Sequence, residues 1–373
     1  MSNKSFYISN LNGLRFLAAF AVILGHTELT KKSLGLSNLL DSNLGFFNSG
    51  GGHQGVVLFF VLSGFLITIL LIKEKERYKT INFKKFIIRR ALRIWPVYFL
   101  FVSTIIFAFH GIGSLLEEKT NGGLLIGMYL LILPNLAMSG FGSIKHIAHL
   151  WSIGVEEQFY LIWPFILKYF SRRKIILIMC FLVVVIPIIP HFADFLAVRF
   201  PGYTWFLKII RLFFQYFLIN SMAIGGLLAF IYTKYGLLIK KRINFLVSSV
   251  IIGLCILLWA MGVHFSGIND VVYPFIFGVF ILVVSLSPPL LLFENKIVSY
   301  LGKISYGLYV YHWVVIYLFF SFLKENEIEL GYFLSLSVSF IITVLISSLS
   351  YELLEKNILK FKVKYALIKS GKI

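Results

Sequence analysis

Long apolar stretches recur along almost the whole chain, and they limit what it can fold into more than any other feature. Most are long enough for a helix that crosses the roughly 30 Å hydrocarbon core of a bilayer. Lipid offers the backbone no hydrogen-bond partner, so such stretches are expected to be helical. The stretches lie at 11–30, 54–72, 94–110, 122–138, 151–170, 175–190, 206–232, 243–263, 271–287, 304–322 and 332–352. They predict an all-α integral membrane protein.

Composition supports this prediction and excludes other classes. The 373 residues are 59% hydrophobic and 14% charged, with a mean hydropathy of +0.88, which is too apolar for a soluble protein of this length. The net charge of +19 is explained by basic cytoplasmic loops that face anionic membrane lipid. No basic patch alternates with exposed aromatic residues, so we expect no nucleic-acid partner.

The basic clusters predict how the helices are oriented. If every stretch crossed the membrane, two of these clusters would lie outside, against the tendency of Lys and Arg to stay in the cytoplasm. A segment 122–138 that enters and returns on the outer side puts all of them inside, and its Pro134 and Asn135 suit broken helix. We therefore expect about ten transmembrane helices, a re-entrant segment and cytoplasmic termini. The clusters are Lys73–Arg93, Lys168–Lys174, Lys234–Arg242 and the tail from Lys356.

The remaining organisation is simple. Residues 1–355 are expected to form one transmembrane domain, and residues 356–373 a short basic cytoplasmic tail that lies on the membrane surface. The first apolar stretch carries Arg15 and lacks a clear cleavage site, so we expect it to remain as a helix. Cys180 and Cys255 fall inside apolar stretches and indicate neither a disulfide nor a metal site.

Arg15 and His26 lie eleven positions apart in the first helix. That spacing returns to nearly the same face, with about 16 Å between them along the axis. An ionisable residue inside a membrane helix is costly, which makes it a candidate for function. The simpler alternative is that Arg15 extends to the cytoplasmic surface and His26 lies at the outer interface. A histidine is also the side chain best suited to take a proton from a hydroxyl near neutral pH.

Two further stretches contain polar residues that have a structural explanation as well as a functional one. Ser63 and Gly64 interrupt the apolar run Phe59–Phe65, where small residues favour close helix packing over a serine nucleophile. Arg90 and Arg93 are three apart, hence on one helical face before Ile94-Trp95-Pro96. They are either the basic flank of a membrane helix or a clamp for phosphate groups, which guanidinium groups bind in bidentate fashion.

The run HLWSIGVEEQFY at His149–Tyr160 places two adjacent acids in a membrane helix. On a regular helix His149, Ser152 and Glu156 share a face, and Glu157 points about a quarter turn away. A carboxylate beside an imidazole sets its tautomer and stabilises the imidazolium. We therefore expect Glu156 or Glu157 to orient His26, or else to pair with an arginine as a structural ion pair.

The run SYGLYVYHW begins at Ser305. Ser305, Tyr309 and His312 share one helical face, and His312 lies deep in the bilayer, so it should face protein or a cavity. The histidines have no ligand spacing that calls for a metal, and we expect none.

Taken together, five stretches resemble the membrane-bound acyltransferase family 3, the O-acyltransferases that modify bacterial surface glycans. They occur in the family's order and cover nearly the whole chain, between residues 10 and 313. The matching stretches are Arg15-x10-His26, FFVLSGF at Phe59–Phe65, Arg90-x-x-Arg93, HLWSIGVEEQFY at His149–Tyr160 and SYGLYVYH at Ser305–His312.

The resemblance implies a ten-helix enzyme of the bacterial cytoplasmic membrane. Such an enzyme takes an acyl group, usually acetyl, from cytoplasmic acyl-CoA and moves it to a hydroxyl of an extracytoplasmic glycan, such as O-antigen, capsule or another surface polysaccharide. In the family both basic pairs are regarded as essential, a role that carries over to Arg15, His26, Arg90 and Arg93. Some members have a C-terminal extracytoplasmic esterase-like domain. Without one, this chain is expected to acylate its acceptor directly or with a separate partner enzyme.

These observations lead to a hypothesis for the mechanism. The phosphates of acyl-CoA bind Arg90 and Arg93, Arg15 lines the cavity for the pantetheine arm, and His26 is the general base. A covalent acyl-enzyme at His26 is an alternative route. The remaining expected cavity residues are Ser63, His149, Ser305, Tyr309 and His312.

A transporter or flippase for glycans or lipid-linked sugars is the main alternative function. It too would have buried Arg, His and Glu side chains along a path, although the sequence has no evident inverted repeat. A non-catalytic accessory subunit would leave His26 dispensable.

Overall fold

The fold is built from helices, as the apolar stretches predict. The structure is a computed structural model that describes residues 7–40, 45–48, 50–110 and 121–368, and this part of the chain contains no strand. The long helices are α1 (Leu11–Ser33), α3 (Gly51–Tyr78), α4 (Phe83–Ile105), α8 (Trp151–Tyr169), α9 (Arg172–Arg199), α11 (Ile219–Arg242), α12 (Phe245–Ala260), α13 (Asn269–Leu286), α16 (Ser305–Glu325) and α17 (Tyr332–Ser350).

Shorter helices connect the long ones. The α-helical connections are α2 (Gly45–Asn48), α6 (Gly122–Leu130), α7 (Pro134–Gly140), α10 (Thr204–Tyr216), α14 (Leu291–Glu294), α15 (Lys296–Lys303) and α18 (Lys356–Lys362). Single turns of 3₁₀- or π-helix occur at η1 (Ile106–His110), η2 (Ala148–Leu150), η3 (Pro201–Tyr203), η4 (Tyr351–Glu355) and η5 (Val363–Tyr365).

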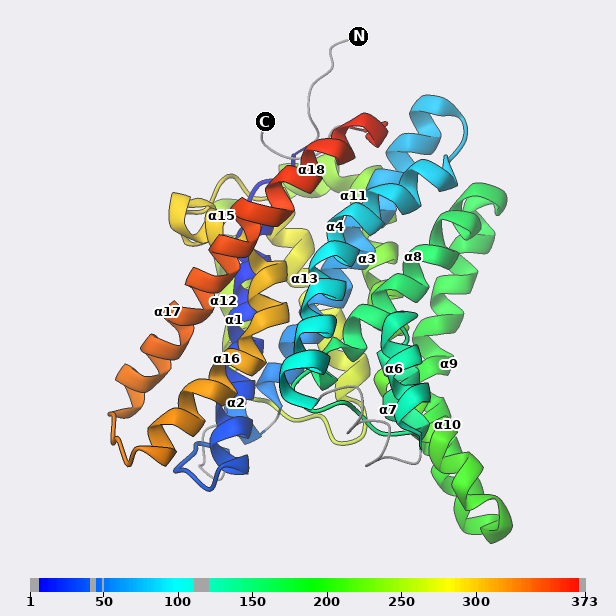
Figure 1. The fold of residues 1–373 in the computed structure, drawn as a ribbon. Helices are drawn as coiled ribbons and strands as arrows, with labels where there is room; N and C mark the ends of the chain where they lie inside the picture. The colour runs from blue at the N-terminus through cyan, green and yellow to red at the C-terminus, as the bar shows by residue number, and fades with distance from the viewer. Residues whose placement is uncertain (1–6, 41–44, 49, 111–120, 369–373) are drawn as a thin grey trace.

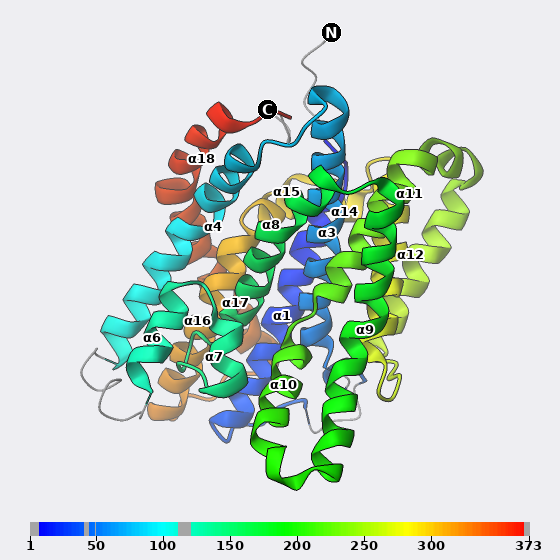
Figure 2. The same cartoon turned by 90° about the vertical axis from the view of Figure 1, so that its right-hand side faces the viewer.

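The prediction of an all-α membrane protein is confirmed. Within the described residues, seven helical stretches are long and apolar enough to cross a bilayer by length and composition. The helices α1, α8 and α12 run in the same bundle beside them (Figures 1 and 2).

Helix α3 forms the centre of the bundle. Of the 18 most apolar consecutive residues in α3, 72% are buried in the protein, whereas in α9 the corresponding share is 22%. The exposed side chains of α9 are mostly apolar, including Leu177, Phe181 and Phe195. In a bilayer those side chains would contact lipid, while α3 contacts other helices.

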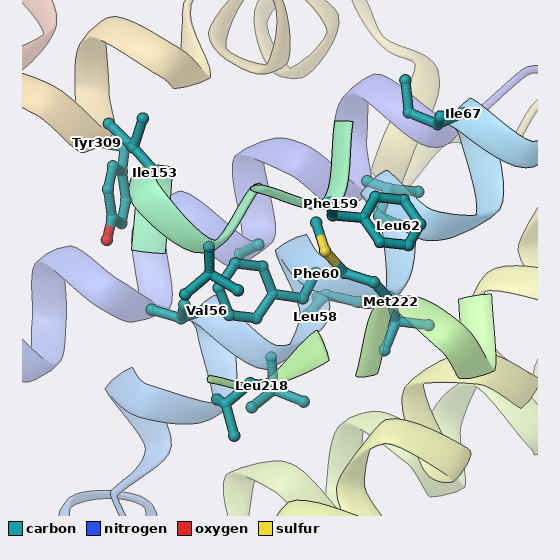
Figure 3. Close-up of a cluster of buried hydrophobic side chains, with 14 of the residues drawn as sticks. Val56, Leu58, Phe60, Leu62, Ile67, Ile153, Phe159, Leu218, Met222 and Tyr309 are labelled. Carbon is teal, nitrogen blue, oxygen red and sulfur yellow. The ribbon is translucent and has the colours of Figure 1, made fainter. Parts of the chain in front are cut away.

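Small residues let α3 approach its neighbours closely. A Cβ at Gly64 would clash with the backbone of Met222 on α11, and one at Gly25 of α1 would lie 2.8 Å from the Cα of Gly52. The packing explanation of the Ser63-Gly64 pair is therefore correct for Gly64. Figure 3 shows the apolar side chains around this contact, including Phe60 of α3 near Met222.

The expected re-entrant segment consists of two short helices, α6 and α7. They have nine and seven residues, which at about 1.5 Å per residue is too short to cross a bilayer. The side-chain amides of Asn135 on α7 and Gln158 on α8 exchange hydrogen bonds of 3.0 and 3.2 Å. This reciprocal pair holds the segment against the bundle and satisfies buried polar groups.

Two boundaries differ from the sequence-based expectation. The stretch 206–232 is not one helix, because the chain turns at Phe217-Leu218. Two helices replace the one expected: α10, before the turn, packs on α9, and α11, after the turn, packs on α3. The basic stretch Lys73–Arg93 is mostly helical, since α3 continues to Tyr78 and α4 starts at Phe83. The Asn82 side chain caps α4 by accepting a hydrogen bond from the backbone N–H of Lys85.

The basic elements gather at one end of the bundle. The start of α1, the α3–α4 turn, the end of α11 and α18 all lie at the upper end in Figure 1. The end of α1, with α6, α7 and α10, lies toward the opposite end. Arg15 lies near the start of α1 and His26 nearer its end, so the two residues lie toward opposite ends of the bundle.

Candidate active site

His26 lies in a cluster of aromatic rings between α1 and α16. Its Nδ1 is 2.6 Å from Nε2 of His312. The centroids of the two rings are 4.9 Å apart, and the ring planes are nearly parallel, with an angle of 4° between them. The indole of Trp313 also stacks on His26, with 4.2 Å between the ring centroids. His312 is fully buried, so the cluster excludes bulk water from this side of the imidazole.

The hydrogen bonds of the cluster assign the proton positions. Nδ1 of His312 is 2.6 Å from the carbonyl oxygen of Tyr309, and a carbonyl only accepts, so this nitrogen carries the proton. In the neutral ring Nε2 of His312 then accepts a hydrogen bond from Nδ1–H of His26. Nε2 of His26 is left with a lone pair that can accept a proton.

Tyr309 and His149 connect this cluster to α8. The hydroxyl of Tyr309 donates to the backbone carbonyl of His149 at 2.7 Å and lies 2.6 Å from Oγ of Ser152. Nε2 of His149 donates to the carbonyl of Val310 at 3.1 Å, while its Nδ1 is buried and has no hydrogen-bond partner in the part of the chain that the structure describes. The shared helical faces expected for His149 with Ser152, and for Tyr309 with His312, thus meet at one contact between α8 and α16.

The second cluster contains the three arginines expected to bind a donor. Arg15, Arg90 and Arg93 line the same cavity, together with Tyr160. The guanidinium of Arg90 lies over the rings of Tyr160 and Phe86, 5.4 and 5.6 Å from their centroids. Among the described residues, none of the three arginines forms an ion pair with a carboxylate. Three adjacent cations with free donors are suited to bind an anion.

Glu156 belongs to the arginine cavity. Its Oε1 accepts a hydrogen bond of 2.5 Å from the hydroxyl of Ser63, and both residues line the cavity with Arg15 and Arg90. The expected hydrogen bond from His26 to Glu156 is therefore not formed in the described residues. His312 occupies that position, because α16 brings its imidazole against α1 at the depth of His26.

Glu157 points away from these cavities. Its Oε2 accepts a hydrogen bond of 2.9 Å from the indole of Trp95 on α4, and Oε1 is buried with no hydrogen-bond partner among the described residues. The quarter-turn offset from Glu156 explains the difference, since it directs Glu157 toward α4. Of the two adjacent acids, only Glu156 lines a cavity that also contains arginine.

Three cavities that share lining residues lie between the two clusters. A cavity of about 480 Å³ at the α18 end shares Arg15, Ser63 and Arg90 with a second, smaller cavity. The second cavity shares Val56 and Tyr309 with a third of about 450 Å³, which is lined by His26 and by the glycines at 50–52. Ser305 lines the middle one. The cavities follow one another along the direction of α1, from its start toward its end.

Sequence reasoning missed several residues of this region. Trp313 stacks on His26, Tyr160 packs under Arg90, and Lys303 and Lys362 line the first cavity. Trp313 and Tyr160 were detectable, because they end or directly follow the stretches that carry His312 and Glu156. Lys303 and Lys362 had no distinguishing signal among the many basic residues. In the described part of the chain, no group of three or more His, Cys, Asp or Glu residues is arranged to hold a metal ion.

Comparison with known families agrees with the five stretches. The model of an acyltransferase domain, that of acyltransferase family 3, matches residues 8–352. The chain belongs to acyltransferase family 3. The match includes both basic pairs, the re-entrant segment and the run that contains His312.

Relatives in this family share most of the chain. The O-acetyltransferase OatA of Staphylococcus aureus is 29% identical over 95% of this chain and 57% of its own length. The putative peptidoglycan O-acetyltransferase YrhL of Bacillus subtilis is 28% identical over 94% of this chain and 55% of its own. The peptidoglycan O-acetyltransferase OatA of Listeria monocytogenes is 34% identical over 44% of this chain and 25% of its own. The chain spans about half the length of the curated relatives it matches. No solved structure matches it.

Proposed function

We propose that this chain is a transmembrane O-acyltransferase that moves an acetyl group from cytoplasmic acetyl-CoA to a hydroxyl of an extracytoplasmic glycan. The observation that carries the proposal is a series of neighbouring cavities, lined by three arginines at one end and by His26 at the other. Membership of acyltransferase family 3 and the names of the relatives support the reaction class. The basic loops support a cytoplasmic position for the arginine end.

The donor binds at the arginine end. Arg90 and Arg93 hold its phosphate oxygens through charge-assisted hydrogen bonds, and Arg15 adds a third cation. The pantetheine arm runs through the middle cavity, past Ser63 and Tyr309, and brings the thioester toward His26. The rise of about 16 Å between Arg15 and His26 along α1 is the distance that this arm has to cover.

The acetyl transfer takes place at His26. Nε2 of His26 accepts the proton of the glycan hydroxyl while its oxygen attacks the thioester carbonyl carbon. The C–S bond then breaks, and the proton passes from His26 to the departing sulfur of CoA. His312 holds the His26 ring in the tautomer that has Nε2 free, and it accepts the Nδ1–H hydrogen bond as positive charge develops. A transient acetyl group on Nε2 of His26 is the alternative route.

The acceptor is proposed to be a cell-wall glycan, and peptidoglycan is the first to test because relatives are named as peptidoglycan O-acetyltransferases. A polymer outside the membrane would reach His26 through the third cavity, at the end of α1 away from α18. A separate extracytoplasmic partner enzyme, receiving the acyl group from this chain, is the alternative to direct transfer.

Mass spectrometry of the surface glycans tests the proposal. Three strains are compared: a deletion, the deletion with the wild-type chain restored, and the deletion with His26→Ala. We expect O-acetyl groups to disappear on deletion, to return with wild type and to remain absent with His26→Ala. If the glycan itself disappears from the surface, the chain is a transporter. If His26→Ala restores the acetyl groups, His26 is not the base and an accessory role is favoured.

A further inference from the structure

The cavity at the α18 end is lined by more positive charge than the three arginines supply. Lys303 and Lys362 line it as well, and no Asp or Glu is among its described lining residues. Arg15, Arg90 and Arg93 also line the middle cavity, whereas the two lysines line only the outer one. The cationic lining therefore has two levels, with the arginines deeper and the lysines nearer to the end of the bundle.

Lys362 reaches the cavity because the C-terminal segment folds back over the bundle. Helix α18 packs on α4, as Figure 1 shows. Nη1 of Arg89 donates to the carbonyl of Tyr365 at 2.8 Å, and the hydroxyl of Tyr78 donates to the carbonyl of Leu367 at 3.2 Å. These contacts hold the segment against the end of α3 and the first turns of α4. Lys362 lies beyond the family match, which ends at residue 352.

Lys303 comes from the other side of the cavity, at the end of α15. Its ammonium lies 5.1 Å from the centroid of the Tyr351 ring, which holds the long side chain without neutralising it. The hydroxyl of Ser299, another lining residue, is buried and has no hydrogen-bond partner within the described ranges. Among the described residues, neither lysine forms an ion pair with a carboxylate. Two cations and an unpartnered donor thus face one space.

We propose that Lys303 and Lys362 form a subsite for a phosphate monoester, which in the proposed donor is the 3′-phosphate of CoA. The inference rests on the proposed function. In CoA the diphosphate lies between the pantetheine arm and the 3′-phosphorylated ribose. With the diphosphate on Arg90 and Arg93 and the thioester toward His26, the ribose phosphate points the other way. That direction leads to the two lysines, and lysine ammonium groups bind phosphate as point charges.

The alternative explanation is that both lysines only attract anionic lipid headgroups at the membrane surface. Lipid attraction acts on exposed basic side chains and treats neighbouring lysines alike. Lys303 is exposed, whereas Lys362 is half-buried, so Lys362 is the residue that distinguishes the two explanations. Lys364 provides a matched control, because it lies two residues from Lys362, is exposed and does not line the cavity. The subsite depends on Lys362 and not on Lys364.

Binding of CoA and of 3′-dephospho-CoA to the purified full chain in detergent tests the subsite. We expect wild type to bind CoA at least about tenfold more tightly than dephospho-CoA, in line with the strength of hydrogen bonds to charged groups. Lys362→Ala and Lys303→Ala should each weaken CoA binding and leave dephospho-CoA binding unchanged, so that the preference falls severalfold. Lys364→Ala should keep the full preference.

Other results would overturn the subsite in distinguishable ways. Equal binding of CoA and dephospho-CoA by wild type would mean that no group recognises the 3′-phosphate, while the proposed donor stands. Equal weakening of both ligands in Lys362→Ala, or the same loss in Lys364→Ala, would assign the lysines a general electrostatic role. No binding of CoA by wild type would remove the proposed acyl-CoA donor itself.

Discussion

At the residue scale, the proposed base has an imidazole as its partner, and no carboxylate among the described residues bonds to it. Nδ1–H of His26 donates to His312, and His312 in turn donates to a backbone carbonyl. A neutral acceptor sets the tautomer of His26 while adding no fixed negative charge to a buried site, where an unpaired charge would be costly. We therefore propose that His312 is a positioning residue, which acts on the reaction through its hydrogen bond to His26.

Replacing His312 should separate positioning from binding. We expect His312→Ala to lower the turnover of acetyl transfer on the order of 100-fold, because the His26 ring loses the acceptor that fixes its tautomer. CoA affinity should stay at the wild-type value. His312→Gln offers an amide oxygen to Nδ1–H of His26 and should recover part of the turnover. Steady-state kinetics with isothermal titration of CoA measures both quantities. An unchanged turnover in His312→Ala would contradict this role.

Glu156 is the other residue whose role can be tested directly. Its carboxylate accepts a hydrogen bond from Ser63 beside Arg15, Arg90 and Arg93. We expect Glu156→Gln to fold, because the amide is isosteric, and to lose most turnover through altered charge in the arginine cavity. Glu157→Gln is the matched control. It lies outside the cavities and should keep more activity. Wild-type turnover in Glu156→Gln would make that carboxylate purely structural.

At the scale of elements, close packing of α3 positions the site. Helix α3 supplies Ser63 to the arginine cavity and Val56 to the passage toward His26, so its distance from α1 and α11 decides the width of the cavities. That distance depends on glycine where helices meet backbone to backbone.

A pair of glycine substitutions tests this packing. Gly64→Ala places a methyl group against the Met222 backbone, which must shift, so we expect a loss of stability of about 1–3 kcal/mol. Gly253→Ala on α12 has no neighbouring atom within 4 Å and should be neutral or slightly stabilising, as expected from helix propensity. Thermal unfolding in detergent compares them. Equal midpoints for Gly64→Ala and wild type would show that the contact can relax freely.

At the scale of the whole molecule, the arginine cluster and the His26 cluster lie toward opposite ends of one helix bundle. The basic turn between α3 and α4 and helix α18 lie at the arginine end (Figure 1). The connection after α1 lies at the His26 end. An acyl donor and a glycan acceptor on opposite sides of a membrane would each have a cavity on their own side.

Single cysteines test this orientation. In a background with Cys180 and Cys255 replaced by Ala, Ser37→Cys lies after α1 and Thr80→Cys lies in the α3–α4 turn. We expect a membrane-impermeant maleimide to label Ser37→Cys in intact spheroplasts and Thr80→Cys only after permeabilisation, because basic turns stay in the cytoplasm. The reverse labelling pattern would invert the proposed direction of transfer.

The sequence by itself determined the class of fold and the residues worth examining. Apolar stretches predict membrane helices because lipid leaves the backbone no other partner, and buried Arg, His and Glu stand out because their burial is costly. Spacing along one helix correctly placed His149 with Ser152, and Tyr309 with His312, on shared faces. These are local properties, which a helical repeat is enough to specify.

Only the tertiary structure decided which of these faces meet. Whether His26 contacts Glu156 or His312 depends on where the packing of the bundle places α8 and α16 relative to α1, and helix packing is set by many small contacts far apart in sequence. The same holds for Lys362, whose position depends on α18 folding back onto α4. One basic side chain among 35 lysines and arginines carries no sign of its neighbours until the chain has folded.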